Sequence, residues 1–154
     1  MYKHVLVPID GSETARLGLQ EAIKLAKHLN ADIRIIHVIN KLPWVSPGEL
    51  PAEAMQALID DLRGSGESVV HDATTAVRNA GVAVDSRLIE ALGSDAGECI
   101  VKEAAAWPAD LIVCGTHGRR GVRRILMGSD AEHILRHSPV PVLMIRKTTA
   151  PQRQ

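Results

Sequence analysis

Residues 110–129 read Asp-Leu-Ile-Val-Cys-Gly-Thr-His-Gly-Arg-Arg-Gly-Val-Arg-Arg-Ile-Leu-Met-Gly-Ser. After its first residue, the segment 110–115 is a continuous apolar run that ends in glycine, which is typical of a strand buried on both faces. Gly128 and Ser129 then introduce a segment that reads as a helix to about His137. The stretch therefore predicts a strand, a glycine-rich loop and a helix, in that order.

The rest of the chain repeats this alternation of strand and helix. Besides 110–115, short runs rich in β-branched and aliphatic residues predict strands over residues 4–10, 32–39, 82–90 and 140–145. Apolar spacing, caps and glycine stops predict helices over residues 12–29, 52–80, 94–107 and 129–137. The sequence Arg63-Gly-Ser-Gly66 predicts a weak point or kink in the second helix, because glycine costs about 1 kcal/mol against alanine inside a helix.

This order of elements predicts an α/β fold: a single doubly wound open sheet of five parallel strands, order 3-2-1-4-5, with helices on both faces. We expect one domain over residues 1–147 and a flexible C-terminal tail over 148–154. In such a sheet the winding reverses between strands one and four, and ligands bind outside the carboxyl ends of the strands at that point. Here those ends carry Asp10-Gly-Ser12 and Gly115-Thr-His-Gly118.

Composition narrows the classes of partner. Apolar residues make up 45% of the 154 residues but aromatic residues only 2%, so the core must be aliphatic. Eighteen basic residues balance eighteen acidic ones, and the chain lacks aromatic stacking platforms, so we expect no nucleic-acid partner. No apolar run approaches the roughly 20 residues needed to cross a bilayer, and no leader pattern is evident, so we expect no membrane partner. The two cysteines form no CxxC pair, which favours a reducing, cytoplasmic location.

The glycine-rich stretch has the chemistry of a phosphate site. Two residues separate Gly115 from Gly118, and nine separate Gly118 from Gly128. Glycines after a strand let main-chain N–H groups approach phosphate oxygens, and the start of the following helix favours an anion. The four arginines at positions 119, 120, 123 and 124 either add charge-assisted contacts to phosphate or form a solvated loop.

The pattern G-x2-G-x9-G-[ST], the strand end Pro8-Ile9-Asp10-Gly11-Ser12 and the last strand Val-Pro-Val-Leu together resemble the universal stress protein family. The resemblance extends from Met1 to Arg146. Members with this glycine pattern are of the ATP-binding type. The resemblance thus implies ATP as ligand, accompanied by Mg²⁺ or Mn²⁺, and a homodimer formed through the last strand, Val140–Ile145.

The resemblance also implies a role for individual residues. Residues 8–10 would border the adenine and ribose, Val38 would lie against the adenine, and residues 115–118 would follow the ribose and phosphates. Gly128 and Ser129 would hold the distal phosphates. Asp130 stands where the family often has an apolar residue, and it either weakens phosphate binding or caps the first helical turn. The expected nucleotide-binding residues are Pro8, Ile9, Asp10, Val38, Gly115, Thr116, His117, Gly118, Arg119, Arg120, Gly121, Gly128, Ser129 and Asp130.

Catalytic constellations are not apparent in the sequence. It contains no Walker lysine pattern and no evident Ser-His-Asp or metal-ligand set, and we assign no catalytic residue. His133 and His137 lie four residues apart on a predicted helix without a third ligand, which favours surface histidines. The leading hypothesis is an ATP-binding stress-response or signalling module with an unknown protein client. The alternatives are a slow ATPase or adenylyl-type hydrolase on the same architecture, and a structural stress protein that binds no nucleotide.

Overall fold

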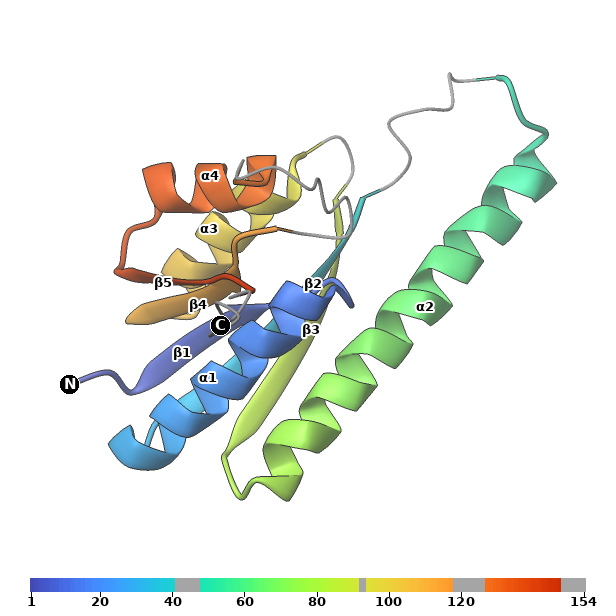
Figure 1. The fold of residues 1–154 in the computed structure, drawn as a ribbon. Coiled ribbons are helices and arrows are strands. Elements are labelled where there is room, and N and C mark those ends of the chain that lie inside the picture. The colour runs from blue at the N-terminus through green and yellow to red at the C-terminus, as the bar shows by residue number, and fades with distance from the viewer. Residues whose placement is uncertain (41–47, 92–93, 118–126, 148–154) are drawn as a thin grey trace, which may run out of the picture.

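The computed structural model describes residues 1–40, 48–91, 94–117 and 127–147. Within these ranges strands and helices alternate along the chain (Figure 1). In chain order they are β1 (His4–Pro8), α1 (Glu13–Leu29), β2 (Asp32–Asn40), α2 (Ala52–Asn79), β3 (Val84–Ala91), α3 (Ala96–Ala106), β4 (Leu111–Gly115), α4 (Ser129–His137) and β5 (Val142–Ile145). The predicted tail, residues 148–154, lies outside the described residues.

The strands form one parallel sheet in the order β3-β2-β1-β4-β5, which confirms the predicted topology. β1 lies in the middle, where Val5 pairs with Ile33 of β2 on one side and with Leu111 of β4 on the other. The chain winds outward from β1 in one direction through β2 and β3, and in the other through β4 and β5. The reversal therefore lies between β1 and β4, as the sequence predicts.

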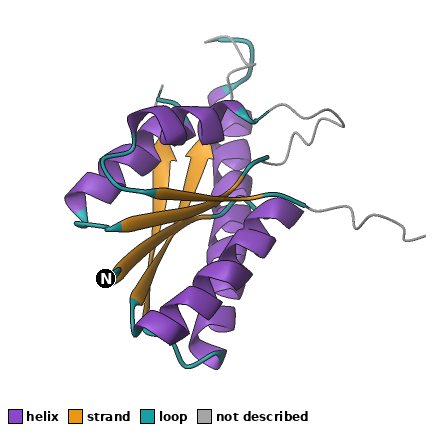
Figure 2. Ribbon diagram, turned by 60° about the vertical axis from the view of Figure 1, so that its left-hand side comes forward, coloured by secondary structure: helices purple, strands orange, loops and turns teal. Residues whose placement is uncertain are grey.

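Two apolar layers flank the sheet, and Figure 2 shows it lying between helices. Val5 and Val7 of β1 pack on the face covered by α1 and α2, whereas Leu6 packs on the face covered by α3 and α4. This alternation follows from the two-residue period of a strand. Burial of a large aliphatic side chain contributes about 1.5–3 kcal/mol, so the fully buried strand residues on both faces anchor the strand ends that form the site.

The helix termini follow local sequence signals. The Ser12 hydroxyl accepts a hydrogen bond from the Ala15 N–H at 3.2 Å and caps α1, as predicted. Asn30 ends α1 in the left-handed conformation, with φ of 51°. Gly81 follows α2 with φ of +77°, which glycine adopts without strain. These residues set where the chain turns back toward the sheet.

Helix α2 does not kink at its two glycines, which corrects the sequence-based expectation. It runs unbroken over Ala52–Asn79, and Figure 1 shows it straight. Gly66 is buried, and a Cβ added there would lie 2.9 Å from Cδ2 of His37 and 3.0 Å from Cδ1 of Leu88. Packing against the sheet therefore outweighs the low helix propensity of glycine, and close approach to β2 and β3 explains Gly66.

The last strand is shorter than predicted. It begins at Val142 rather than Val140, because Val140 belongs to a turn. The Ser138 hydroxyl donates to the Val140 carbonyl at 2.7 Å, and its oxygen accepts a hydrogen bond from the Val140 N–H at 3.2 Å. Pro141 still contributes its carbonyl, which accepts from the Ile112 N–H at 3.0 Å.

Candidate functional site

The carboxyl end of β4 lies directly against the start of α1. A Cβ on Gly115 would come within 2.8 Å of the Thr14 carbonyl carbon and 2.9 Å of its hydroxyl oxygen. Because real side chains do not approach main chain so closely, Gly115 is required for this packing. The glycine predicted as a phosphate-loop residue thus has a structural role, which is to let the β1–α1 turn and the end of β4 meet.

Two main-chain bonds of Thr116 connect the end of β4 with the end of β5 and with the start of α4. The Thr116 N–H donates to the Ile145 carbonyl at 2.9 Å, and the Thr116 carbonyl accepts from the Gly128 N–H at 2.9 Å. The bond between residues 116 and 128 therefore joins the end of β4 to the start of α4. Gly118, Arg119, Arg120 and Gly121, which the sequence predicts as ligands, fall between these points and lie outside the described residues.

Helix α4 begins without a side-chain cap. Gly128 is the N-cap residue and has no side chain to accept from the first-turn N–H groups, and Ser129 is exposed. A helix start of this kind carries a partial positive charge and N–H donors suited to an anion. The bond between Gly128 and Thr116 brings the predicted pair Gly128 and Ser129 to the carboxyl end of β4.

Asp130 lies in the first turn of α4, and its side chain makes a contact that the sequence did not predict. Its Oδ1 accepts from the Gly97 N–H of α3 at 3.2 Å, so it caps the start of a different helix. The two helices are close here, since a Cβ on Gly97 would lie 2.8 Å from Cβ of His133 and 3.0 Å from the Asp130 carbonyl oxygen. Asp130 therefore joins the starts of α3 and α4.

The β1–α1 turn is held by its own polar side chains. Oδ1 of Asp10 accepts from the Ser12 N–H at 2.9 Å, which forms a tight turn directly after β1. The Thr14 hydroxyl donates to the His117 carbonyl, which ties the start of α1 to the segment that follows β4. Sequence reasoning missed Thr14, because its partner lies 103 positions away and no local pattern marks it.

Strand β2 extends past the end of β1. Pairing of β1 with β2 ends at Pro8 and Ile36, whereas pairing of β2 with β3 continues to Asn40 and Ala91. The Ile9 N–H donates to the Ile36 carbonyl at 2.9 Å, so Ile36 directs its main-chain groups toward β1. Val38, two residues on, directs its own groups to the same side, beyond the last strand pair. Its side chain packs against the apolar residues on the face of the sheet that α3 and α4 cover.

His117 adds an unsatisfied donor or acceptor to the site. Its Nδ1 lies 2.9 Å from the Thr116 hydroxyl, while its Nε2 is buried and has no hydrogen-bond partner among the described residues. A buried polar atom left in this state costs about 1–3 kcal/mol, so a ligand or water that reached it would be favoured. The neighbouring thiol offers no nucleophile, because burial raises the pKa of Cys114 to about 12.

Metal ligands do not gather in the described part of the chain, where no three His, Cys, Asp or Glu side chains are placed to share an ion. The rings of His133 and His137 on α4 have centroids 4.3 Å apart and planes inclined by 31°. Nδ1 of His137, which is exposed, donates to the carbonyl of the half-buried His133 at 3.0 Å. Across the described ranges, no helix has the length and apolar character that a membrane span requires.

The family model described as the universal stress protein family matches residues 1–146. The chain belongs to the universal stress protein family. A universal stress protein of Methanocaldococcus jannaschii is 35% identical over 96% of this chain and 84% of its own length. A solved universal stress protein family structure from Burkholderia pseudomallei is 35% identical with a TM-score of 0.75, covering 94% of this chain and 96% of that one.

More distant members share the fold. The universal stress protein from Archaeoglobus fulgidus, solved in complex with dAMP, is 22% identical with a TM-score of 0.63. The match covers 94% of this chain and 98% of that chain. The family assignment confirms the resemblance read from the glycine pattern and the strand ends, and the shared fold agrees with the five-stranded parallel sheet.

Proposed function

We propose that this universal stress protein binds an adenine nucleotide, ATP, at the carboxyl ends of β1 and β4, and acts as a nucleotide-dependent stress-response module. The observation that carries the proposal is the bond between Thr116 and Gly128, because it brings the uncapped start of α4 to the switch point of the sheet. Related structures of the family that hold cAMP, dAMP or AMP support it.

The proposed arrangement follows the geometry of the described residues. The phosphates approach the N–H groups of Ser129 and the next residues of α4, where the helix start favours negative charge. The base lies toward the main-chain edge of Val38, beyond the end of β1. The ribose then lies near the β1–α1 turn at Asp10, and the buried Nε2 of His117 gains a partner from the ligand.

A divalent ion, Mg²⁺ or Mn²⁺, accompanies the triphosphate in this proposal. The described residues provide no group of three ligands, and one oxygen of Asp10 already accepts from Ser12. Phosphate oxygens and water would therefore supply most of the coordination, which suits Mg²⁺. We further propose that the protein works in the cytoplasm with an unidentified protein client, in keeping with its two free cysteines, Cys99 and Cys114.

The decisive experiment compares ATP with adenosine on the variant Ser129→Asp. A carboxylate at the first helical position repels phosphate but does not destabilise the helix, because acidic residues are favoured there. By calorimetry we expect the ATP dissociation constant to rise at least about tenfold, or about 1.4 kcal/mol, with adenosine binding little changed. Equal ATP affinity in the variant contradicts the phosphate assignment.

Two measurements on the unaltered protein separate the alternatives. Denaturing the purified protein and identifying any released nucleotide tests whether the site is used at all. If no adenine nucleotide is released and none binds at millimolar concentration, the chain is a structural stress protein. Steady phosphate release of several per second, near the median enzyme rate of about 10 per second, would instead favour the ATPase alternative.

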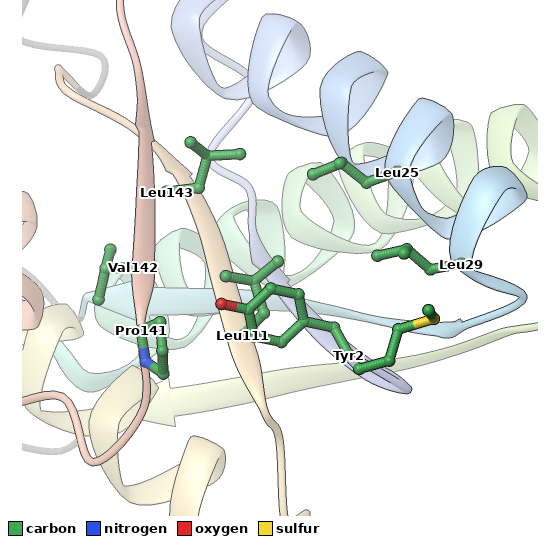
Figure 3. A pocket seen from close by; sticks show the side chains of 8 residues that line it. Tyr2, Leu25, Leu29, Leu111, Pro141, Val142 and Leu143 are labelled. Atoms are coloured by element: carbon green, nitrogen blue, oxygen red, sulfur yellow. The ribbon is translucent and has the colours of Figure 1, made fainter.

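We also propose a homodimer through the last strand. In the described sheet β5 pairs only with β4, so it forms one edge of the sheet, and β3 forms the other. The carbonyls of Pro141 and Ile145 accept bonds from Ile112 of β4 and from Thr116, which directly follows it. The main-chain groups of the alternate residues, Val142 and Met144, therefore point outward and can pair with a second copy. Although Pro141 has no main-chain N–H, it therefore removes no donor from the outward-facing edge. An apolar groove adjoins this edge, and Figure 3 shows it bordered by side chains of α1 and β5.

Two leucines of equal exposure allow a matched test of the dimer. Leu143 of β5 is 37% exposed at the groove, and Leu50, which precedes α2, is 38% exposed. Light scattering should give twice the 16.6 kDa of one chain for the unaltered protein and for Leu50→Glu. Leu143→Glu should give a single chain, because it places a charge in the apolar contact. A monomeric unaltered protein, with and without ATP, contradicts the dimer.

A further inference from the structure

His37 is a buried histidine in the apolar strand β2, and it contacts the end of β1. The residue is 7% exposed, and its Nδ1 lies 2.7 Å from the Ile9 carbonyl oxygen. Because a carbonyl can only accept, Nδ1 carries the proton and donates it to this bond. Ile9 directly precedes Asp10, so the bond acts on the main chain where β1 enters the proposed nucleotide site.

The position of the imidazole ring is set by α2. Gly66 brings the helix main chain so close that a Cβ there would lie 2.9 Å from Cδ2 and 3.3 Å from Nε2 of His37. The ring therefore lies between the helix and the Ile9 carbonyl. The Ile9 N–H is held in addition by the Ile36 carbonyl at 2.9 Å. The N–H and the carbonyl of Ile9 are thus both bound to β2, the N–H by the main chain of Ile36 and the carbonyl by the side chain of His37.

The same bond explains why the strand pairing stops where it does. In a regular parallel ladder, the Ile9 carbonyl would next accept from the Val38 N–H. Pairing ends instead at Pro8 and Ile36, and His37 supplies the partner of Ile9. The main-chain edge of Val38 consequently extends beyond the end of β1, at the place proposed for the base.

We propose that His37 is a positioning residue of the nucleotide site. It holds the Ile9 carbonyl, and so orients the β1–α1 turn at Asp10 and keeps the edge of Val38 open to the adenine. This inference rests on the proposed nucleotide function. His37 acts through Ile9 and does not touch the nucleotide. Helix α2 takes part through Gly66, so a helix on one face of the sheet helps to shape the site at its edge.

The test compares His37→Asn with His37→Leu in the full-length protein. The amide nitrogen of asparagine can occupy the place of Nδ1 and donate to Ile9, whereas leucine cannot donate. We expect the ATP dissociation constant to rise at least about tenfold in His37→Leu and to stay within about threefold of the unaltered protein in His37→Asn. Urea unfolding of each variant measures stability separately, so a loss of packing cannot imitate this pattern.

Each outcome bears on a defined claim. If the unaltered protein binds no nucleotide, the proposed function itself fails. If it binds ATP and both variants bind equally well, or lose affinity equally while folded, His37 is not a positioning residue. Nitrogen-15 spectra of the His37 ring add an independent measurement. They should show the Nδ1–H tautomer, and a neutral ring protonated at Nε2 would contradict the bond to Ile9.

Discussion

Gly64 and Gly66, two residues apart in α2, permit a matched pair of substitutions to alanine. Both lie inside the helix, so each substitution gains the same helix propensity, about 1 kcal/mol. They differ in what the new methyl group would meet. At Gly64 nothing lies within 4 Å, whereas at Gly66 the methyl would lie 2.9 Å from the His37 ring and 3.0 Å from Cδ1 of Leu88.

The expected magnitude follows from these contacts. The end of the Leu88 side chain can rotate away, but the His37 ring is held by its 2.7 Å bond to Ile9. Overpacking of a core costs about 1–3 kcal/mol, which offsets or exceeds the gain in propensity. Gly64→Ala should therefore stabilise the protein by up to about 1 kcal/mol. Gly66→Ala should fall below Gly64→Ala by about 1–3 kcal/mol, because the propensity gain is common to both.

Urea unfolding followed by circular dichroism measures this difference, provided that the slope of free energy against urea is the same in all three proteins. Equal stabilisation by both substitutions would show that α2 does not press on the His37 ring. That result would refute both the packing explanation of Gly66 and the role of α2 in positioning His37. A lower stability of Gly64→Ala than of the unaltered protein would refute the assignment of that position to an open helix surface.

Thr14→Val should weaken ATP binding several-fold, because it removes the hydroxyl that holds the His117 carbonyl at the site, and a lost hydrogen bond costs about 0.5–1.5 kcal/mol. Thr74→Val is its control: that hydroxyl is buried without a partner among the described residues, so calorimetry should show unchanged binding, and loss in both variants would contradict the assignment. Stability should fall at alkaline pH through Cys114, whose pKa burial raises to about 12 from an ordinary 9.0. The unfolded chain then loses the thiol proton first, so this contribution is intact below pH 9 and declines above it, by about 1.4 kcal/mol between pH 8 and pH 10. Urea unfolding of Cys114→Ala should lack this part of the decline, and an identical pH dependence in both proteins would refute it.

The order and type of the elements were predictable from sequence because their signals are local. Strands and helices differ in the period of their apolar residues, and Ser12 and Gly81 mark helix ends by side-chain or main-chain chemistry that acts within a few positions. The parallel order 3-2-1-4-5 follows from the alternation of strand and helix, together with the right-handed rule for crossovers. The glycine spacing after β4 likewise identified the family.

The contacts that build the candidate site were decided only by the tertiary structure. Thr14 and His117 are 103 positions apart, Gly97 and Asp130 are 33 apart, and Ile9 and His37 are 28 apart. Such pairs meet because the sheet sets neighbouring strands in register and because small residues set how closely the helices pack. Neither the strand register nor the packing distance is encoded in a local sequence period. For that reason Gly66 read as a helix-weakening residue in the sequence, while in the fold it is where α2 reaches the sheet.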